Sequence, residues 1–160
     1  MPIPSRPQRP SEIHREWIQN LIANRPDLNQ ANLNRTQQLM DEAFPDAQVT
    51  EYEKLKPDLT LPDPNDIHVL AAAVKCEAEY IITFNLKDFP TEHLQIHKVT
   101  SIHPDHFISL LIDESPKTAT IAFQRQVSFL QNPPSSNQQV LESLKKCGLK
   151  ESSRLIDKIL

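Results

Sequence analysis

The sequence of 160 residues has a formal net charge of −4 and holds 14 prolines but a single glycine, Gly148. Walker loops and dinucleotide-binding loops need several glycines near phosphate, so the composition excludes both. The longest apolar run, Val69–Val74, is far shorter than the roughly 20 residues of a membrane span, and no secretory signal precedes it. Two cysteines, Cys76 and Cys147, indicate neither a disulfide framework nor a zinc site. We expect a cytoplasmic protein.

The charges are unevenly distributed along the chain. Residues 36–66 carry eight acidic and two basic side chains, whereas residues 116–160 carry three acidic and seven basic ones. This pattern fits ordinary solvated helix faces. It equally fits an acidic centre that holds divalent cations, beside a basic tail that contacts phosphates. Composition alone leaves both interpretations open.

The first 62 residues predict two helices and one short strand. Residues 1–10 hold four prolines and no periodicity, so we expect an irregular lead-in. Apolar residues at helical spacing then predict a helix from Ser11, a candidate N-cap, to about Asn24. The elements expected next are a helix over roughly 30–44 capped by Asp27 or Asn29, a strand at Ala47–Thr50 and a loop over 53–62.

The central part of the chain has the pattern of an α/β unit. Asp63-Pro64 is a strong helix start, and the apolar residues after it predict a buried helix to about Glu77. Tyr80–Phe84 is a continuous β-branched and aromatic run, which indicates a parallel strand covered on both faces. The remaining expected elements are a loop over Asn85–Pro90, a helical turn near 91–94, a strand at Val99–Ile102 that pairs with Tyr80–Phe84, and a helix over Pro104–Asp113.

The last 45 residues predict a helical extension. Helices over 116–131, 137–147 and 149–160 are separated by prolines and by Gly148, a natural C′ residue, and Asn137 or Ser136 can cap the second of them. We therefore expect three parts: a lead-in over 1–10, an α/β domain with a reduced parallel sheet over 11–115, and a helical C-terminal extension over 116–160.

Two carboxylates of the central part are candidates for a metal site. Asp66 lies in the first turn of the buried helix, and Asp88 follows the carboxyl end of the buried strand, the edge at which open α/β sheets bind ligands. Carboxylates brought together without a basic residue repel, unless a cation such as Mg²⁺ neutralises them. The alternative makes Asp66 a helix-start residue and Asp88 a loop acid, and the residues alone leave both open. Asp63 is better interpreted as a helix cap.

The segments Asp66-Ile-His-Val-Leu-Ala-Ala-Ala and Ile-Ile-Thr-Phe-Asn-Leu-Lys-Asp88-Phe resemble the second half of a PIN domain, the fold of VapC-type toxin ribonucleases. The helix that begins Ser11-Glu-Ile-His-Arg-Glu16 resembles the one that supplies this family's glutamate. The resemblance extends over about residues 11–112, and the helical tail is similar to that of a larger VapC-like subgroup. It implies a PIN-like three-layer fold.

The resemblance also implies a metal-dependent endoribonuclease, the toxin of a toxin–antitoxin pair. Glu16, Asp66 and Asp88 match three acids of the family and would bind one or two Mg²⁺ or Mn²⁺ ions, which activate water and stabilise charge on the phosphate. Asn85 stands where many members have a further aspartate, and Thr83 matches a threonine that orients this loop. His68 receives no role. The implied partners are an RNA substrate, a cognate antitoxin and a second copy of the chain. No association with a membrane is expected.

One family element has no counterpart. PIN domains begin with an apolar strand that ends in a metal-binding aspartate, but here the glutamate helix follows ten proline-rich residues, and neither Asp27 nor Asp41 fits the motif. We therefore expect an N-terminally truncated PIN domain with impaired cleavage. The alternative is a non-catalytic PIN remnant that acts only through protein binding or has no function.

Two further groups of residues carry less weight. His103-Pro-Asp-His106 has the look of a metal-ligand pair, but a histidine at a strand-to-helix junction is more often a helix cap. Lys145, Lys146 and Lys150 lie on amphipathic helices, where a solvated face is a simpler interpretation than RNA contact.

Overall fold

The computed structural model describes residues 6–160. These residues form two compact units, the first made of residues 6–81 and 85–101 and the second of residues 82–84 and 102–160. Both strands and helices are present, and the strands are parallel, so the predicted α/β class is confirmed. Among the described residues, no helix is long and apolar enough to cross a membrane.

The first unit opens with a short strand that the sequence analysis missed. Arg9–Pro10 forms β1, which pairs in parallel with β2, Gln48–Val49. The prediction of an irregular lead-in over 1–10 is therefore wrong for residues 9–10; residues 1–5 lie outside the described part of the chain. Proline is tolerated here because a two-residue ladder at a sheet edge does not need every backbone N–H.

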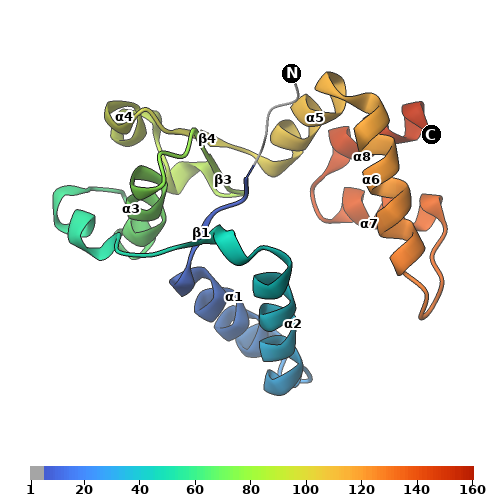
Figure 1. The fold of residues 1–160 in the computed structure, drawn as a ribbon, viewed down its shortest axis with the longest axis horizontal. Helices are drawn as coiled ribbons and strands as arrows, with labels where there is room; N and C mark the ends of the chain where they lie inside the picture. The colour runs from blue at the N-terminus through green and yellow to red at the C-terminus, as the bar shows by residue number, and fades with distance from the viewer. Residues whose placement is uncertain (1–5) are drawn as a thin grey trace. The chain divides into compact units, whose positions relative to one another are not determined.

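Two antiparallel helices connect β1 to β2 (Figure 1). They are α1, Ser11–Asn24, and α2, Gln30–Ala43, close to the predicted bounds. The Asn29 side chain accepts a hydrogen bond from the Ala31 backbone and caps α2, whereas α1 starts at Ser11 without a side-chain cap. The following stretch, expected to be a loop, contains a 3₁₀ helix, η2, over Glu53–Asp58.

The helix that begins after Asp63 forms in two segments. Pro64–Asp66 is a single 3₁₀ turn, η3, whose N-cap Asp63 accepts a hydrogen bond from the Asn65 backbone. Ile67–Lys75 continues as α3, and its apolar residues are largely buried, as predicted. Asp63 is thus a structural cap, in line with its expected role.

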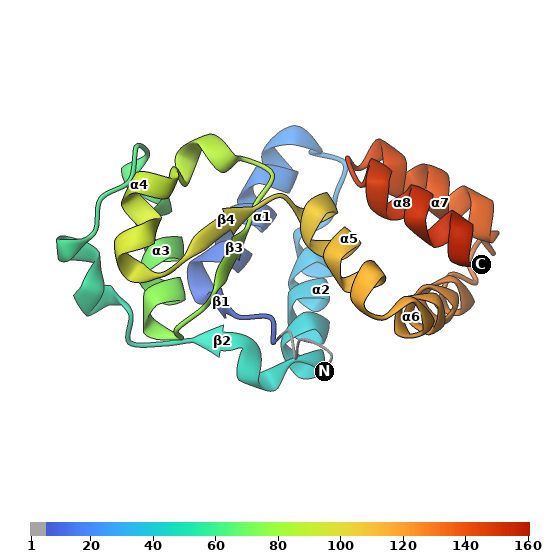
Figure 2. The ribbon, with the colours of Figure 1, turned by 90° about the horizontal axis from the view of Figure 1, so that it is seen from above.

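A parallel strand pair follows α3, with β3 at Tyr80–Ile82 and β4 at Thr100–Ile102 (Figure 2). The Thr100 N–H donates to the Glu79 carbonyl and the Thr83 N–H donates to the Ile102 carbonyl, so the predicted pairing is confirmed. The two sheets of the described residues hold two strands each, and no third strand joins β3 and β4.

The predicted burial of this strand on both faces is wrong. Ile81 is buried, but Tyr80, Ile82 and Phe84 are 39%, 49% and 61% exposed. An unbroken apolar run is compatible with a strand covered on one side only, because periodicity reports residue type and not what packs on it. The segment between the strands contains η4, Leu86–Asp88, then α4, Thr91–Leu94, and η5, Gln95–His97.

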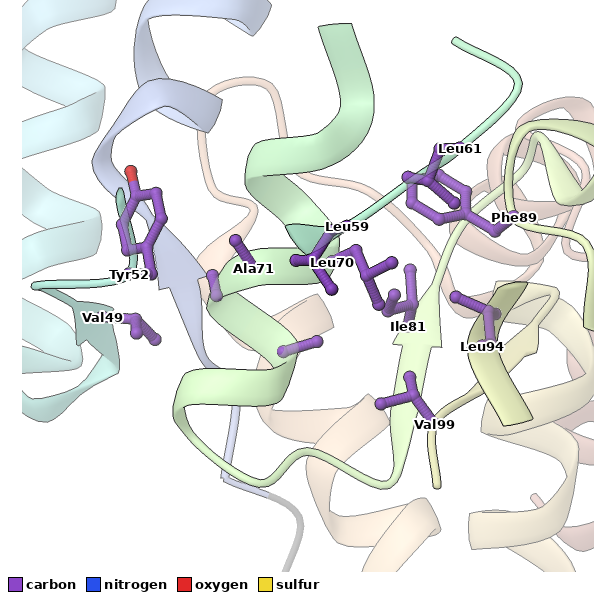
Figure 3. Packing of buried hydrophobic residues seen from close by; sticks show 12 residues of the cluster. Val49, Tyr52, Leu59, Leu61, Leu70, Ala71, Ile81, Phe89, Leu94 and Val99 are labelled. Atoms are coloured by element: carbon purple, nitrogen blue, oxygen red, sulfur yellow. The ribbon is translucent and has the colours of Figure 1, made fainter. Parts of the chain in front are cut away.

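The core of the first unit lies around α3 (Figure 3). Leu70 and Leu94 are completely buried, and Tyr52 is 1% exposed. Ile81 of β3 packs into the same cluster, which joins the helix to the strand pair. Burial of these side chains removes apolar surface from water and fixes the loops that carry Asp66 and Asp88 to one core.

The second unit is built from four helices around a separate core. They are α5, Pro104–Glu114; α6, Pro116–Phe129; α7, Asn137–Lys146; and α8, Lys150–Ile159. The four helices contribute the buried core residues Ile112, Phe123, Val140, Leu141 and Ile156. The predicted helical extension is confirmed, and α5 packs against α8 and α6.

The helix ends of this unit follow from local sequence. Ser136 and Gln139 form a reciprocal capping box at the start of α7, and Gly148 takes a φ of +90° between α7 and α8. The His103 side chain accepts a hydrogen bond from the Asp105 backbone at 3.1 Å and caps α5. The cap interpretation of the His103 and His106 motif therefore holds for His103.

Candidate metal and active site

Glu16 projects from the middle of α1 toward the start of α3. Its Oε1 atom lies 3.3 Å from Nε2 of His68, although the two residues are far apart in the sequence. The Glu16 side chain is 41% exposed, whereas His68 is buried. One candidate acid thus lies at the boundary between solvent and the first turn of α3.

Asp66 is the last residue of η3 and directly precedes α3. Partial burial raises the pKa of its carboxyl group, and the negative charges of Asp63, Asp88 and Glu16 raise it further, while His68 opposes them. The charges of Asp88 and Glu16 therefore reach Asp66 within the first unit. Repulsion among them is the condition under which a cation is bound favourably.

Asp88 ends η4, just beyond the carboxyl end of β3. The Asn85 side-chain amide donates a hydrogen bond to Oδ2 of Asp88 and orients that carboxylate. Asn85 acts here as a partner of Asp88. Thr83 takes part in the strand pairing through its backbone N–H.

His68 contacts the candidate acid Glu16, a contact that the sequence analysis did not predict. Its side chain is 5% exposed, and Nδ1 lies 2.7 Å from the Asn65 carbonyl oxygen. Its Nε2 atom is the one buried side-chain nitrogen or oxygen, among the described residues, with no hydrogen-bond partner. The sequence placed His68 in the first turn of the helix that Asp66 precedes. A lone histidine in an apolar helix, however, does not by itself indicate a functional contact.

A partly buried network holds α1 against η2 beside this site. The Tyr52 hydroxyl and the Lys56 ammonium both donate to the Glu12 carboxylate, the latter at 2.7 Å. Burial opposes ionisation of Glu12, but these two hydrogen bonds outweigh it and hold its pKa below the usual value. Burial and the Glu12 contact raise the pKa of Tyr52 to about 12, so this hydroxyl remains a donor across the physiological range. The network fixes one turn of α1, and Glu16 lies on the next turn.

A second network joins β1, α1 and α2. The Trp17 indole N–H donates to Nδ1 of His14 at 2.9 Å, and the Arg9 Nε–H donates to Nε2 of the same ring at 2.8 Å. Oδ1 of Asp41 lies 3.1 Å from that Nε2 atom. Arg9 pairs with the same Asp41 carboxylate at 2.7 Å and lowers its pKa. Asp41 is therefore engaged by Arg9 and His14.

Glu16, Asp66 and Asp88 do not form a metal-binding cluster in this structure. Within residues 6–160, no three acidic, histidine or cysteine side chains stand close enough together to hold a metal ion. Two shallow hollows on the first unit lie along α1 and α2 instead, and Glu16, Asp66 and Asp88 line neither of them. The assignment of these three acids as metal ligands stays a prediction.

The comparisons with known proteins address the same segments. Residues 12–87 match the PIN domain, and residues 104–157 match the VapC50 C-terminal domain. The first of these matches covers a little under half of the chain, so the chain is similar to a PIN domain over residues 12–87. This segment contains Glu16 and Asp66 and ends one residue before Asp88. The predicted PIN-like fold is therefore confirmed, and residues 104–157 are similar to a second, separate family.

One curated relative matches over part of its length. The protein named "Putative ribonuclease VapC50" from Mycobacterium tuberculosis (strain ATCC 25618 / H37Rv) is 35% identical over 79 residues. That stretch is 49% of this chain and 47% of the relative, so the chain spans about half the length of the relative. No solved structure matches the chain.

Proposed function

We propose that this protein is a PIN-domain, metal-dependent endoribonuclease of the VapC toxin type, with Glu16, Asp66 and Asp88 as its metal ligands. The observation that carries the proposal is the match of residues 12–87 to the PIN domain, together with the position of Glu16 at the first turn of the helix that Asp66 precedes. The charges of Asp88 and Glu16 also raise the pKa of Asp66. Two of them lie in the segment that matches the PIN domain, and the third directly follows it. The name of the M. tuberculosis relative points to the same reaction class.

The donor set fits the proposed ion chemically. Mg²⁺ and Mn²⁺ bind carboxylate oxygens, and three acids without an interposed Lys or Arg would bind one such ion with a gain in electrostatic energy. The ion supplies an activated water and neutralises charge on the scissile phosphate. Asn85 holds the Asp88 carboxylate in place, and the Glu12 network holds the helix of Glu16.

The proposed partners follow from the toxin type. They are an RNA substrate, a cognate antitoxin and a second copy of the chain. Leu39, Met40 and Phe44 of α2 and its C-terminal end are 41% to 53% exposed, so the first unit offers apolar surface for a protein partner.

We also propose that the 160-residue chain cleaves RNA slowly. The family's first metal-binding aspartate has no counterpart in residues 6–160, where Asp27 pairs with Arg25 and Asp41 pairs with Arg9. Loss of one acid weakens both metal affinity and the orientation of the attacking water.

The test combines RNA cleavage with metal binding. Purified chain, in excess over labelled single-stranded RNA, is incubated with Mg²⁺ or Mn²⁺ or with a chelator, and Mn²⁺-induced stabilisation is measured by thermal unfolding. We expect slow, metal-dependent cleavage and a rise in Tm with Mn²⁺. Asp66→Asn should abolish both effects. Asp27→Asn is the matched control on the same unit, because its carboxylate pairs with Arg25 on the surface, and it should retain them.

Two results would contradict the proposal. Cleavage that persists in chelator, or that Asp66→Asn leaves unchanged, would refute the assignment of these ligands. Mn²⁺ binding without any cleavage by either the wild type or Asp27→Asn would favour the alternative of a non-catalytic PIN remnant.

A further inference from the structure

We propose that the solvent face of α6 binds single-stranded RNA, with Phe129 as a stacking platform for a base and with Lys117 and Arg125 as phosphate contacts. This surface lies wholly within the second unit and is separate from the acids of the proposed active site. The choice of RNA as the nucleic acid rests on the proposed function. The exposure, the charge and the ring geometry of this one helix carry the rest of the inference.

The two sides of α6 differ in burial. Phe123 is buried in the core of the second unit, and Ala119 and Val127, four residues before and after it, pack against the same core. Residues four apart share one face of a helix, so these three define the core face. The opposite side carries the α6 stripe, which consists of four exposed residues at the same spacing: Lys117, Ile121, Arg125 and Phe129.

The α6 stripe ends in an aromatic ring that is largely in water. Phe129 is 72% exposed, so the ring buries little apolar surface within the chain and stabilises the fold little. Every nucleic-acid base has a flat π-face, and exposed aromatic side chains bind single strands by stacking on those faces. The exposed ring of Phe129 therefore has the chemistry of a stacking platform.

A positive charge lies beside this ring. The guanidinium carbon of Arg125 is 5.8 Å from the centre of the Phe129 ring, a cation–π contact that restrains both side chains. An aromatic face next to an arginine is the combination that binds a base and its phosphate backbone together. Lys117 lies about 18 Å from Phe129 along the helix axis, at about 1.5 Å per residue, so the stripe is long enough for a few nucleotides.

The charge around the stripe complements a polyanion. The segment from Ser115 to Leu141 contains no Asp or Glu, and its charged side chains are those of Lys117 and Arg125, both positive. The nearest acids along the chain, Glu114 and Glu142, belong to α5 and α7. Phosphates would therefore meet cations along α6 and no carboxylate of the same helix.

The order of residues in the stripe favours RNA over a protein as its occupant. The two apolar side chains, Ile121 and Phe129, are separated by the charged Arg125. The buried core of a protein interface is depleted of charged residues, so an alternation of cations and apolar side chains fits it poorly. Binding through phosphates and stacking should be tolerant of RNA sequence and strongly dependent on salt.

The experiment is fluorescence polarisation of a short, labelled single-stranded RNA titrated with the full chain in chelator, which prevents metal-dependent cleavage. Phe129→Ala should weaken binding by about 10-fold, the effect of one lost stacking contact. Phe129→Trp should retain binding, whereas Phe129→Leu, which stays apolar but cannot stack, should behave like the alanine variant. The side chain is exposed, so these variants should keep the wild-type Tm.

The two cations are tested by the salt dependence of the same measurement. Lys117→Gln and Arg125→Gln should each weaken binding and reduce the slope of log K against log salt by about 0.7, the value for one phosphate contact on a single strand. Lys158→Gln is the matched control, because it removes the same charge from an exposed position on α8, and it should leave affinity and slope nearly unchanged.

The outcomes separate this inference from the proposed function. No binding of single-stranded RNA in chelator, or equal binding by Phe129→Leu and Phe129→Trp, would overturn the inference and leave metal-dependent cleavage to be judged on its own assay. Self-association that Phe129→Ala abolishes, measured by sedimentation, would overturn it in favour of a protein interface. Stacking-dependent binding without cleavage after addition of Mn²⁺ would support the inference and contradict the proposed function.

Discussion

Asp105 connects two helices of the C-terminal unit that are distant in sequence. Its carboxylate accepts the backbone N–H of Glu151 at 2.9 Å and of Ser152 at 2.8 Å, so a residue of α5 caps the first turn of α8. The Ser152 hydroxyl also donates to the Asp105 backbone carbonyl at 2.9 Å. The cap satisfies two orphan donors and places a negative charge at the positive end of the α8 dipole.

Asp105→Asn should therefore destabilise the C-terminal unit. The amide keeps one acceptor oxygen but turns an NH₂ group toward the second backbone N–H, and it removes the charge. A hydrogen bond to a charged group contributes about 1.5–3 kcal/mol, and helix caps contribute about 0.5–2 kcal/mol. We expect a loss of about 2 kcal/mol, which corresponds to a fall in Tm of roughly 4–8 °C for a chain of this size.

The effect of Asp105→Asn on stability should also depend on pH in a defined direction. Burial opposes ionisation of Asp105, but hydrogen bonds from Ser152 and Glu151 outweigh it and lower the pKa of the carboxyl group. A lowered pKa in the folded state contributes stability above the unfolded value of about 3.9, and this stability is lost as the pH falls through the folded pKa. The stability difference between wild type and Asp105→Asn should thus be full at neutral pH and shrink below about pH 4.

The assay is thermal unfolding at several pH values, with hydrogen exchange of the amides in the first turn of α8. Asp113→Asn on the same helix, with an exposed side chain, is the matched control and should change the unfolding free energy by less than about 0.5 kcal/mol. Equal Tm values for the two variants at neutral pH, or unchanged exchange at Glu151 and Ser152, would refute the capping argument.

Two substitutions test packing. Leu70→Ala removes a completely buried side chain from the core of the first unit and should cost about 3 kcal/mol by chemical denaturation, whereas Leu39→Ala, at a half-exposed position, should cost under about 0.5 kcal/mol; similar losses would contradict the assignment of the core. Gly148→Ala places a Cβ 3.3 Å from the Phe84 ring at a φ of +90°, and we expect a loss of about 1–2 kcal/mol in the same measurement. A neutral or stabilising effect of the alanine would show that this turn is not strained.

The helices were predictable because their signals are local. Gly148 and Ser136 mark the boundaries of α7 and α8 by residue type alone, and the structure uses both. The strand at Arg9–Pro10 was not predictable, because its two residues form a strand only through pairing with β2, a partner 39 positions away in register. The exposed side of Tyr80–Ile82 depends likewise on what packs against it.

Some residues of the candidate site could be predicted from the sequence, and some of their contacts could not. Asp66 and Asp88 were identified from their positions at a helix start and beyond a strand end, where topology brings side chains together. The contact between His68 and Glu16 could not be predicted, because the two residues lie on different helices and no local pattern encodes their proximity. The contacts of an isolated histidine depend on its neighbours in the folded structure, which the local sequence does not encode.

The contact between Trp17 and His14 has a spectroscopic consequence. Trp17 is the single tryptophan of the chain, and its indole N–H is bound to a buried ring 6.1 Å away, centre to centre. Selective excitation of indole fluorescence therefore observes one position, on the helix turn that carries Glu16, against no background from other tryptophans. Emission maximum, lifetime and anisotropy would each report on the anchoring of α1 without an added label.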